Sequence, residues 1–244
     1  MAKKYKRKYQ DITPIHCACL IHDTLYDFSY VDKLYRSLCR NLSRQVILHV
    51  FTESNRTVPE PYIKHDLIEW PGIRGPKKSW WYKVQIFNDN QYSGHLLYFD
   101  LDVVILKNID WIWKLSPHNF WAVRDFRYLF RPARATLNSS IMWFDTTAYG
   151  YVYNEFDVKT TNKYHGDQEY IHSKVVTNGL HYLDTAKIKS YKWEVKEGGF
   201  DFSTRKYLEP GKICYPDDTV DILIFHGNPK PHSENSPVIK ENWV

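Results

Sequence analysis

Apolar residues recur along this chain in two patterns: short unbroken runs, and longer stretches with an apolar residue every three or four positions. The short runs predict buried strands, and the periodic stretches predict amphipathic helices. Strands are expected over residues 13–22, 45–51, 64–70, 95–99, 119–126, 139–144 and 221–225. Helices are expected over residues 27–42, 78–88 and 166–175. Because strands and helices alternate through the first half, the pattern predicts an α/β fold with a mainly parallel central sheet and flanking helices.

The chain has 244 residues and shows no internal repeat and no long linker, so it fits a single domain. We expect a basic, flexible arm over residues 1–12, one domain over residues 13–232 and a polar C-terminal tail over residues 233–244. Five of the first eight residues are basic. Such an arm is typical of a solubilising tail, and the alternative is an arm that binds nucleic acid.

Charge and cysteine content narrow the class of protein. The chain carries 33 basic and 28 acidic residues, and it is nearly neutral outside the arm, so there is no strong nucleic-acid signal. None of the 4 cysteines forms a Cys-x-x-Cys pair, which disfavours a structural zinc site and fits reduced thiols. The N-terminus lacks the apolar region of a signal peptide, and no run approaches the roughly 20 apolar residues of a membrane span. We therefore expect a cytoplasmic protein with no transmembrane segment.

Asp100 and Asp102 follow the apolar run His95–Phe99 and are the strongest chemical signal in the chain. Side chains two residues apart in extended backbone point to the same side, so the two carboxylates can converge at the end of a strand. Hard oxygen ligands of this kind suit Mg²⁺ or Mn²⁺, and such a cation suits a diphosphate. The alternative is a strand end followed by a polar turn with both acids solvated.

A second group of polar residues follows the last predicted strand. His226 offers an imidazole as a third ligand for Mn²⁺, Gly227 lets the backbone approach a ligand closely, and Lys230 supplies a positive charge for a phosphate. The alternative is a Gly/Pro turn with a solvated histidine and lysine.

Further polar residues begin or flank other predicted elements. Asp167 and Gln168 open a short helix, where they can bind sugar hydroxyls or lie below an anomeric carbon, although Asp167 can also serve only as a helix cap. Asn138 and Ser139 precede an apolar strand as a small polar platform or an ordinary turn. Lys83 lies on a predicted helix near the sheet edge and can contact phosphate or sugar, or remain solvated.

In this order the segments resemble the retaining GT-A glycosyltransferases of the glycogenin, galactinol synthase and bacterial lipopolysaccharide galactosyltransferase type, and most of all their small microbial members. The resemblance spans roughly residues 15–232. The segments that carry it are Thr24-Leu25-Tyr26, Trp80-Trp81-Tyr82-Lys83, Tyr98-Phe99-Asp100-Leu101-Asp102-Val103-Val104, Asn138-Ser139-Ser140, Gly166-Asp167-Gln168, Tyr191-Lys192-Trp193 and Phe225-His226-Gly227-Asn228-Pro229-Lys230-Pro231.

The resemblance implies a metal-dependent transfer of a hexose from a UDP-sugar to a glycan, lipid or protein acceptor, with retention of anomeric configuration. It implies that Mn²⁺ or Mg²⁺ is held by Asp100, Asp102 and His226. It implies nucleotide contacts from Leu20, Asp23, Tyr26, Lys83, Asp100, Leu101, Gly227 and Lys230, with Tyr26 stacked on uracil. It implies that the transferred sugar is surrounded by Asp125, Asn138, Ser139, Asp167 and Gln168.

The chain departs from the family in one segment. The better-known members have His-x-x-Gly-x-x-Lys-Pro, whereas this chain has His226-Gly227-x-x-Lys230-Pro231, which is two residues shorter. The catalytic residues implied are Asp167, Gln168 and Lys230. Because an amide is a poor nucleophile, we favour attack on the same face as the departing diphosphate, with Asp167 and Gln168 supporting a cationic sugar.

Three other functions remain open at this point. A haloacid-dehalogenase-like phosphatase would use Asp100 and Asp102 as nucleophile and general acid, with Asp217 and Asp218 as later metal ligands. A non-catalytic module would bind sugar nucleotides without turnover. A nucleic-acid-associated protein would act through the basic arm, and its DNA binding would be salt-sensitive and lost on trimming that arm.

Overall fold

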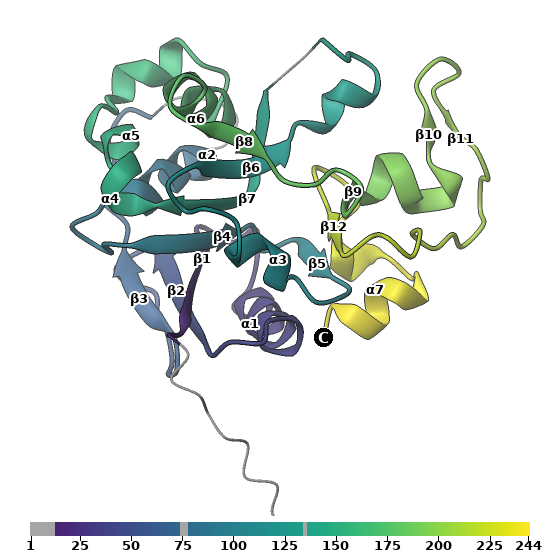
Figure 1. Ribbon diagram of the computed structural model, residues 1–244, viewed down its shortest axis with the longest axis horizontal. Coiled ribbons are helices and arrows are strands. Elements are labelled where there is room, and N and C mark those ends of the chain that lie inside the picture. The colour runs from purple at the N-terminus through teal and green to yellow at the C-terminus, as the bar shows by residue number, and fades with distance from the viewer. Residues whose placement is uncertain (1–12, 74–77, 134–135) are drawn as a thin grey trace, which may run out of the picture.

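The computed structural model describes residues 13–73, 78–133 and 136–244 (Figure 1), so the predicted basic arm over residues 1–12 lies outside the described residues. Within these ranges the central sheet has seven strands in the order β3-β2-β1-β4-β7-β6-β8. Its strands are β1 (Ile15–Leu20), β2 (Val46–Thr52), β3 (Ile63–Asp66), β4 (His95–Phe99), β6 (Phe120–Arg124), β7 (Leu137–Asp145) and β8 (Leu180–Tyr182).

The directions of these strands decide where the functional residues can meet. β1, β2, β3 and β4 pair in parallel, and β6 and β8 also pair in parallel. β7 is antiparallel to both of its neighbours, β4 and β6. The start of β7 therefore lies at the same sheet edge as the carboxyl ends of β1, β4 and β6. The predicted α/β fold with a mainly parallel central sheet is confirmed.

Two smaller sheets complete the strand pairing. One has the order β5-β12-β9, formed by β5 (Val103–Ile105), β12 (Ile222–Ile224) and β9 (Ile188–Ser190). The other is the hairpin of β10 (Phe200–Asp201) and β11 (Lys206–Tyr207), which projects from the body of the molecule in Figure 1. The sequence pattern predicts β12, while β5, β8, β9, β10 and β11 have only two or three residues each and were not predicted.

Helices pack on both faces of the central sheet. The α-helices are α1 (Ser29–Asn41), α2 (Lys78–Tyr82), α3 (Asp110–Trp113), α4 (Thr146–Tyr149), α5 (Tyr151–Asn154), α6 (Asp167–Val175) and α7 (Pro237–Asn242). Shorter helical turns are η1 (Lys83–Phe87), η2 (Phe126–Leu129), η3 (Val158–Asn162), η5 (Lys196–Gly198) and η6 (Pro231–Ser233), and η4 (Tyr191–Val195) is a π-helix.

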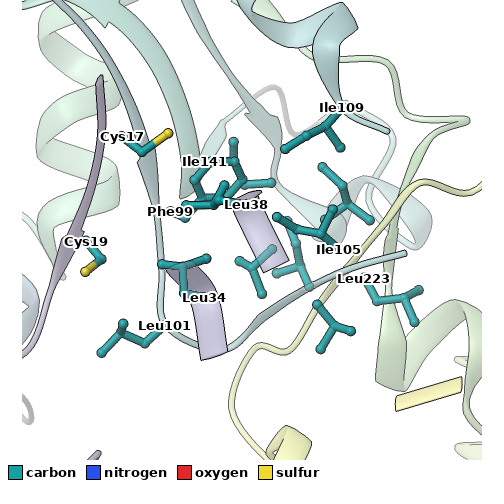
Figure 2. Close-up of a cluster of buried hydrophobic side chains, with 14 of the residues drawn as sticks. Cys17, Cys19, Leu34, Leu38, Phe99, Leu101, Ile105, Ile109, Ile141 and Leu223 are labelled. Atoms are coloured by element: carbon teal, nitrogen blue, oxygen red, sulfur yellow. The ribbon is translucent and has the colours of Figure 1, made fainter. Parts of the chain in front are cut away.

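The alternation of side chains along β4 divides the core into two layers. Leu97 and Phe99 pack with α1 on one face, whereas Leu96 and Tyr98 pack with η1 and α6 on the other. Figure 2 shows the first layer, where Leu34 and Leu38 of α1 lie among Phe99, Ile141 and Leu223. Each face of the strand that carries Asp100 is therefore buried, which fixes the position of its carboxyl end.

Two predicted elements are shorter than expected. The amide of Gln85 accepts a hydrogen bond from the Ile68 N–H and donates one to the Ile68 carbonyl, both at 2.7 Å. The Gln85 side chain thus takes the hydrogen bonds that a neighbouring strand would otherwise make with Ile68. The strand predicted over residues 64–70 is β3, and it ends at Asp66. The helix predicted over 78–88 tightens after Tyr82 into the 3₁₀ turn η1, whose five residues are all buried.

The C-terminal segment differs from the predicted polar tail. Residues 237–242 form α7, and the side chain of Ile239 in this helix is buried against the core. Trp243 is also buried, with its ring edge-on to Tyr30 of α1 at 4.7 Å and the Lys33 ammonium 3.8 Å from its centroid. Four apolar residues among the twelve from 233 to 244 are too few to predict this packing from the sequence.

Candidate active site

The central sheet brings the end of β4 and the start of β7 side by side. Phe99 pairs with Ile141, and the Asp100 N–H donates to the Ser140 carbonyl at 2.8 Å. Asn138 and Ser139 come just before this pairing on the reversed strand. They therefore lie at the same edge as Asp100, as the order of strands requires.

The β5-β12-β9 sheet brings the second polar segment to the same place. Ile224 at the end of β12 pairs with Val103 at the start of β5 and with Ser190 at the end of β9. Asp102 directly precedes Val103, and His226 follows Ile224 by two residues. The pairing of two three-residue strands thus positions Asp102 near His226 across a separation of more than one hundred residues.

These residues line one cavity of about 410 Å³. The predicted site residues that line it are Leu20, Tyr26, Lys83, Asp100, Leu101, Asp102, Asn138, Ser139, Asp167, Gln168, His226, Gly227 and Lys230. Of the predicted set, Asp23 and Asp125 do not line it. A volume of this size suits a small-molecule ligand.

Lys83 binds the carboxylates on one side of the cavity. Its ammonium lies 2.7 Å from Asp100 Oδ1, 3.6 Å from Asp167 Oδ2 and 3.0 Å from Ser139 Oγ. Burial lowers the pKa of Lys83, but the charges of Asp100 and Asp167 raise it more, so the net shift is upward and the ammonium is charged. Tyr98 also donates a hydrogen bond to Asp100 Oδ1 at 2.8 Å.

Asp167 is buried, and its position is set by Ser139, which donates to its Oδ2 at 2.9 Å. Burial raises the pKa of Asp167, and the charge of Lys83 partly opposes this shift. As the first residue of α6, the carboxylate also lies where the helix dipole favours negative charge. The N-cap of α6 is Gly166 and has no side-chain cap hydrogen bond, so Asp167 is the first helical residue and not the cap.

Lys230 binds the second aspartate. Its ammonium contacts Asp102 Oδ2, and the Tyr26 hydroxyl donates to the same oxygen at 2.9 Å. Burial raises the pKa of Asp102, and the charge of Lys230 opposes part of this shift, so the net shift is upward. The Tyr26 ring packs against Tyr30 with centroids 4.4 Å apart, and its hydroxyl has a raised pKa because of burial and Asp102.

His226 is held as a neutral imidazole. Its Nε2 lies 2.7 Å from Ser190 Oγ, and its ring stacks on Phe126 with centroids 5.3 Å apart. The edge of Trp193 closes another side at 4.3 Å. Burial, with the charge of Lys192 next in size, lowers the pKa of His226 to about 3. A neutral imidazole is the form that ligates metal ions.

The carboxylate and imidazole ligands that suit a divalent cation are present, but a lysine ammonium is bound to each of the two aspartates, Lys83 to Asp100 and Lys230 to Asp102. As they stand, the described residues contain no group of three or more His, Cys, Asp or Glu side chains that could hold a metal ion. Lys230 on Asp102 shows that this position favours a positive charge. A metal ion bound by Asp100, Asp102 and His226 would have to replace the Lys230 ammonium at Asp102.

Asp125 lies behind the cavity and holds two of its lining residues. Its carboxylate accepts from Thr136 at 2.9 Å and from the Gln168 amide at 3.3 Å, and Arg127 Nη2 lies 2.6 Å away. Burial raises the pKa of Asp125, but the hydrogen bonds from Arg127 produce a net downward shift. Asp125 therefore positions Gln168 and Arg127 and does not itself line the cavity.

Asp23, which was predicted to contact the base, does not line the cavity. Its φ of 64° places it in the left-handed region, and its carboxylate accepts from the Thr24 N–H at 2.8 Å. His22 and Leu25 line the cavity at this end instead, with the His22 ring stacked on Tyr82 at 4.4 Å.

Several lining residues were missed by the sequence interpretation, namely His22, Leu25, Trp80, Arg127 and His165. The signal for His22 was its place two residues after the end of β1, at the sheet edge where ligands commonly bind in α/β folds. Trp80 is 36% exposed, which for so large an apolar residue is a further signal of a binding surface. No comparable signal in the sequence marks Leu25 or His165.

No known family model matches the chain, and no curated protein matches it in sequence. Solved structures do match in fold. An active-site mutant of LgtC superposes with a TM-score of 0.61 at 11% identity over 91% of each chain. The glycosyltransferase GlyE of Streptococcus pneumoniae TIGR4 gives 0.66 at 16% identity, over 95% of this chain and 59% of that one. The bifunctional glycosyltransferase WbbM gives 0.62 at 12% identity, over 95% and 50%.

This chain has the GT-A glycosyltransferase fold. It spans about half to three fifths of the length of GlyE and WbbM and nearly all of LgtC. At these identities the likeness concerns the fold. No helix in the described ranges is both long and apolar enough to cross a membrane.

Proposed function

We propose that the protein is a metal-dependent glycosyltransferase that moves a hexose from a UDP-sugar to a glycan, lipid or protein acceptor with retention of configuration. The observation that carries the proposal is the cavity itself. It joins Asp100 and Asp102 after β4, the His226–Lys230 segment after β12 and Gln168 on α6, within a GT-A fold. The free thiols of Cys17, Cys19, Cys39 and Cys214 support a cytoplasmic location.

The donor would lie along the carboxyl edge of the central sheet. Leu20 and Tyr26 would contact the base, and Asp100 with the Leu101 backbone would contact the ribose. Gly227 and Lys230 would hold the diphosphate, and Lys83, Asn138, Ser139, Asp167 and Gln168 would surround the sugar. His22 lines the same cavity and stacks on Tyr82. We include His22 in the proposed base pocket in place of Asp23.

Asp100, Asp102 and His226 would hold Mn²⁺ or Mg²⁺. When bound, the metal would act as a Lewis acid for the charge that develops on the leaving diphosphate. In the protein alone, Lys230 balances the charge of Asp102. Its ammonium is then available to the diphosphate once another cation takes that place.

The proposed reaction breaks the bond between the anomeric carbon and the diphosphate oxygen. Negative charge grows on the leaving oxygen, where Lys230 stabilises it, and the sugar becomes cationic. The Gln168 amide nitrogen donates to Asp125, so its carbonyl oxygen is directed away from that carboxylate. An acceptor hydroxyl oxygen would form the new bond to the anomeric carbon on the same face, and its proton would pass to the departing diphosphate oxygen. Gln168 and the carboxylate of Asp167 would support the cationic sugar during this attack.

The first experiment is a screen of nucleotide sugars by thermal shift and donor hydrolysis, with and without Mn²⁺. Asp102→Ala is the test variant and Asp217→Ala the control, because Asp217 lines a different cavity and accepts its hydrogen bonds from Thr219. We expect a metal-dependent response to one UDP-sugar in the wild type and in Asp217→Ala, and its loss in Asp102→Ala. No response to any nucleotide with metal present would refute the transferase proposal.

The same screen separates the alternatives. A phosphatase would release phosphate from a simple aryl phosphate, and it would leave Gln168 and Tyr26 without a role. A non-catalytic module would bind the nucleotide sugar without hydrolysis or transfer. The separation of Asp217 from the cavity that holds Asp100 and Asp102 disfavours the phosphatase.

A further inference from the structure

Lys192 is a cation that the proposed mechanism does not yet use. It lies on η4, which starts directly after Ser190, and Ser190 pairs with Ile224 just before the segment that holds the proposed diphosphate ligands. A Cβ built on Gly227 would lie 3.5 Å from Lys192 Nζ. The ammonium therefore lies beside Gly227, which lines the cavity.

Other cations around this wall are each paired with a carboxylate. Lys230 pairs with Asp102, Arg127 with Asp125, Lys189 with Glu194 and Lys196 with Glu234. For Lys192, by contrast, the described part of the chain supplies no carboxylate, and its nearest ring is Trp193, with the centroid 5.2 Å from Nζ. A half-buried ammonium beside another lysine is unfavourable without a counter-charge, so an anionic ligand would relieve a real energetic penalty.

Gly227 lines the cavity and Lys192 does not, so Gly227 lies between this charge and the cavity. Its φ of 71° lies in the left-handed region that favours glycine, and it has no side chain between the Lys192 ammonium and the cavity. Lys230 follows in the same turn, after Asn228 and Pro229, and its charge acts on Lys192. Two ammonium groups therefore lie near one backbone turn.

We propose that Lys192 is a second cationic contact for the diphosphate group of the donor, acting with Gly227 and Lys230. This inference rests on the proposed function and extends it by one residue. Lys192 would bind the nucleoside diphosphate more strongly as negative charge develops on it, because a charged hydrogen bond is strengthened by charge on its acceptor. The energetic penalty of an unpaired cation in the free protein would be offset on binding.

The test compares wild type with Lys192→Met and Lys192→Arg, with Lys189→Met as a matched control. Lys189 lies three residues earlier and is paired with Glu194 at 3.1 Å. Affinities for UDP, UMP, uridine and inorganic pyrophosphate are measured by calorimetry with Mn²⁺ present, and the thermal midpoint of each ligand-free variant is recorded. Pyrophosphate reports on the phosphate contacts whichever base the cavity prefers.

We expect Lys192→Met to weaken UDP and pyrophosphate about 10- to 100-fold, the range for loss of a charged hydrogen bond, and to leave uridine unchanged. Lys192→Arg and Lys189→Met keep the wild-type affinities. The ligand-free Lys192→Met protein melts at a higher temperature than wild type, because an unpaired cation has been removed. A lysine with only a structural role would lower the midpoint instead.

Two results would overturn the inference, and they have different consequences for the proposed function. If wild type binds UDP or pyrophosphate and Lys192→Met binds them equally well, the Lys192 contact is wrong and the proposed function stands. If wild type binds neither ligand, the proposed function fails together with the inference.

Discussion

At the scale of single residues, His49 couples the stability of the protein to pH. It lies 3% exposed, with its Nε2 2.8 Å from His16 Nδ1 and its Nδ1 2.7 Å from His65 Nε2. A neutral imidazole donates through one nitrogen and accepts through the other, so protonation of His49 would break one of these bonds. Burial, followed by the charges of His65 and His16, lowers the pKa of His49 to about 3.

Because the unfolded chain binds this proton below a pKa of about 6.5 and the folded protein resists it down to about 3, stability is lost as the pH falls through that window. The linkage relation gives a loss of about 2 kcal/mol between pH 7 and pH 5. Urea unfolding at the two pH values measures it. His49→Gln should flatten the pH dependence of the free energy of unfolding. His118→Gln changes an exposed histidine and should leave that dependence as in wild type. An unchanged pH dependence in His49→Gln would contradict the role given to His49.

Gln168 allows a second test at this scale. If its amide supports the cationic sugar, Gln168→Ala should lower the rate of transfer by about 100-fold, within the range for removing one preorganised dipole, with little change in donor affinity. Steady-state kinetics with the identified UDP-sugar measures both. Gln91→Ala, a matched change whose amide bonds to the Asp66 carbonyl outside the cavity, should behave like wild type. Full transfer activity in Gln168→Ala would remove its proposed role.

Asp23 and His22 show what residue patterns can and cannot predict. The end of the first strand was expected to supply the base pocket, and Leu20 and Tyr26 do line the cavity. Of the polar residues between them, His22 lines the cavity, and Asp23, whose φ of 64° is left-handed, does not. A non-glycine residue in that conformation has no reliable signature in a single sequence.

At the scale of elements, β12 positions the second half of the site. Leu223 in its centre is fully buried, so Leu223→Ala should lower the free energy of unfolding by about 2–5 kcal/mol. Chemical denaturation measures the change. Leu208→Ala removes the same atoms from a side chain that is 65% exposed and should change stability by less than about 0.5 kcal/mol. Equal effects of the two changes would contradict the burial of β12.

The longer elements could be predicted from periodicity, and the shortest could not. Asp100 and Asp102 were placed at a strand end because five apolar residues precede them, and β4 has those bounds. His226 was placed after a strand for the same reason. Their meeting depends on β5 and β9, which have three residues each and pair only in the folded protein. The reversed direction of β7, which places Asn138 and Ser139 at the site, also has no local signal.

At the scale of the whole molecule, the C-terminus is part of the core. Deleting residues 237–244 would remove Ile239 and Trp243 and expose the apolar surface of α1 beneath them. We expect a loss of roughly 3–5 kcal/mol in the free energy of unfolding, as for loss of a large buried aromatic residue. Deleting only Val244, which is 46% exposed, is the control and should be nearly neutral. Wild-type stability in the longer deletion would show that α7 does not pack in solution.

The contact between Lys230 and Asp102 makes the two halves of the proposed donor site interdependent. Under the proposed function, a metal ion held by Asp102 would compete with the Lys230 ammonium for this carboxylate, and a diphosphate that bound Lys230 would leave Asp102 available to the metal. Each ligand therefore removes an energetic barrier to the other, and the two should bind cooperatively. Thermodynamic reciprocity requires that the factor by which UDP tightens Mn²⁺ binding equals the factor by which Mn²⁺ tightens UDP binding.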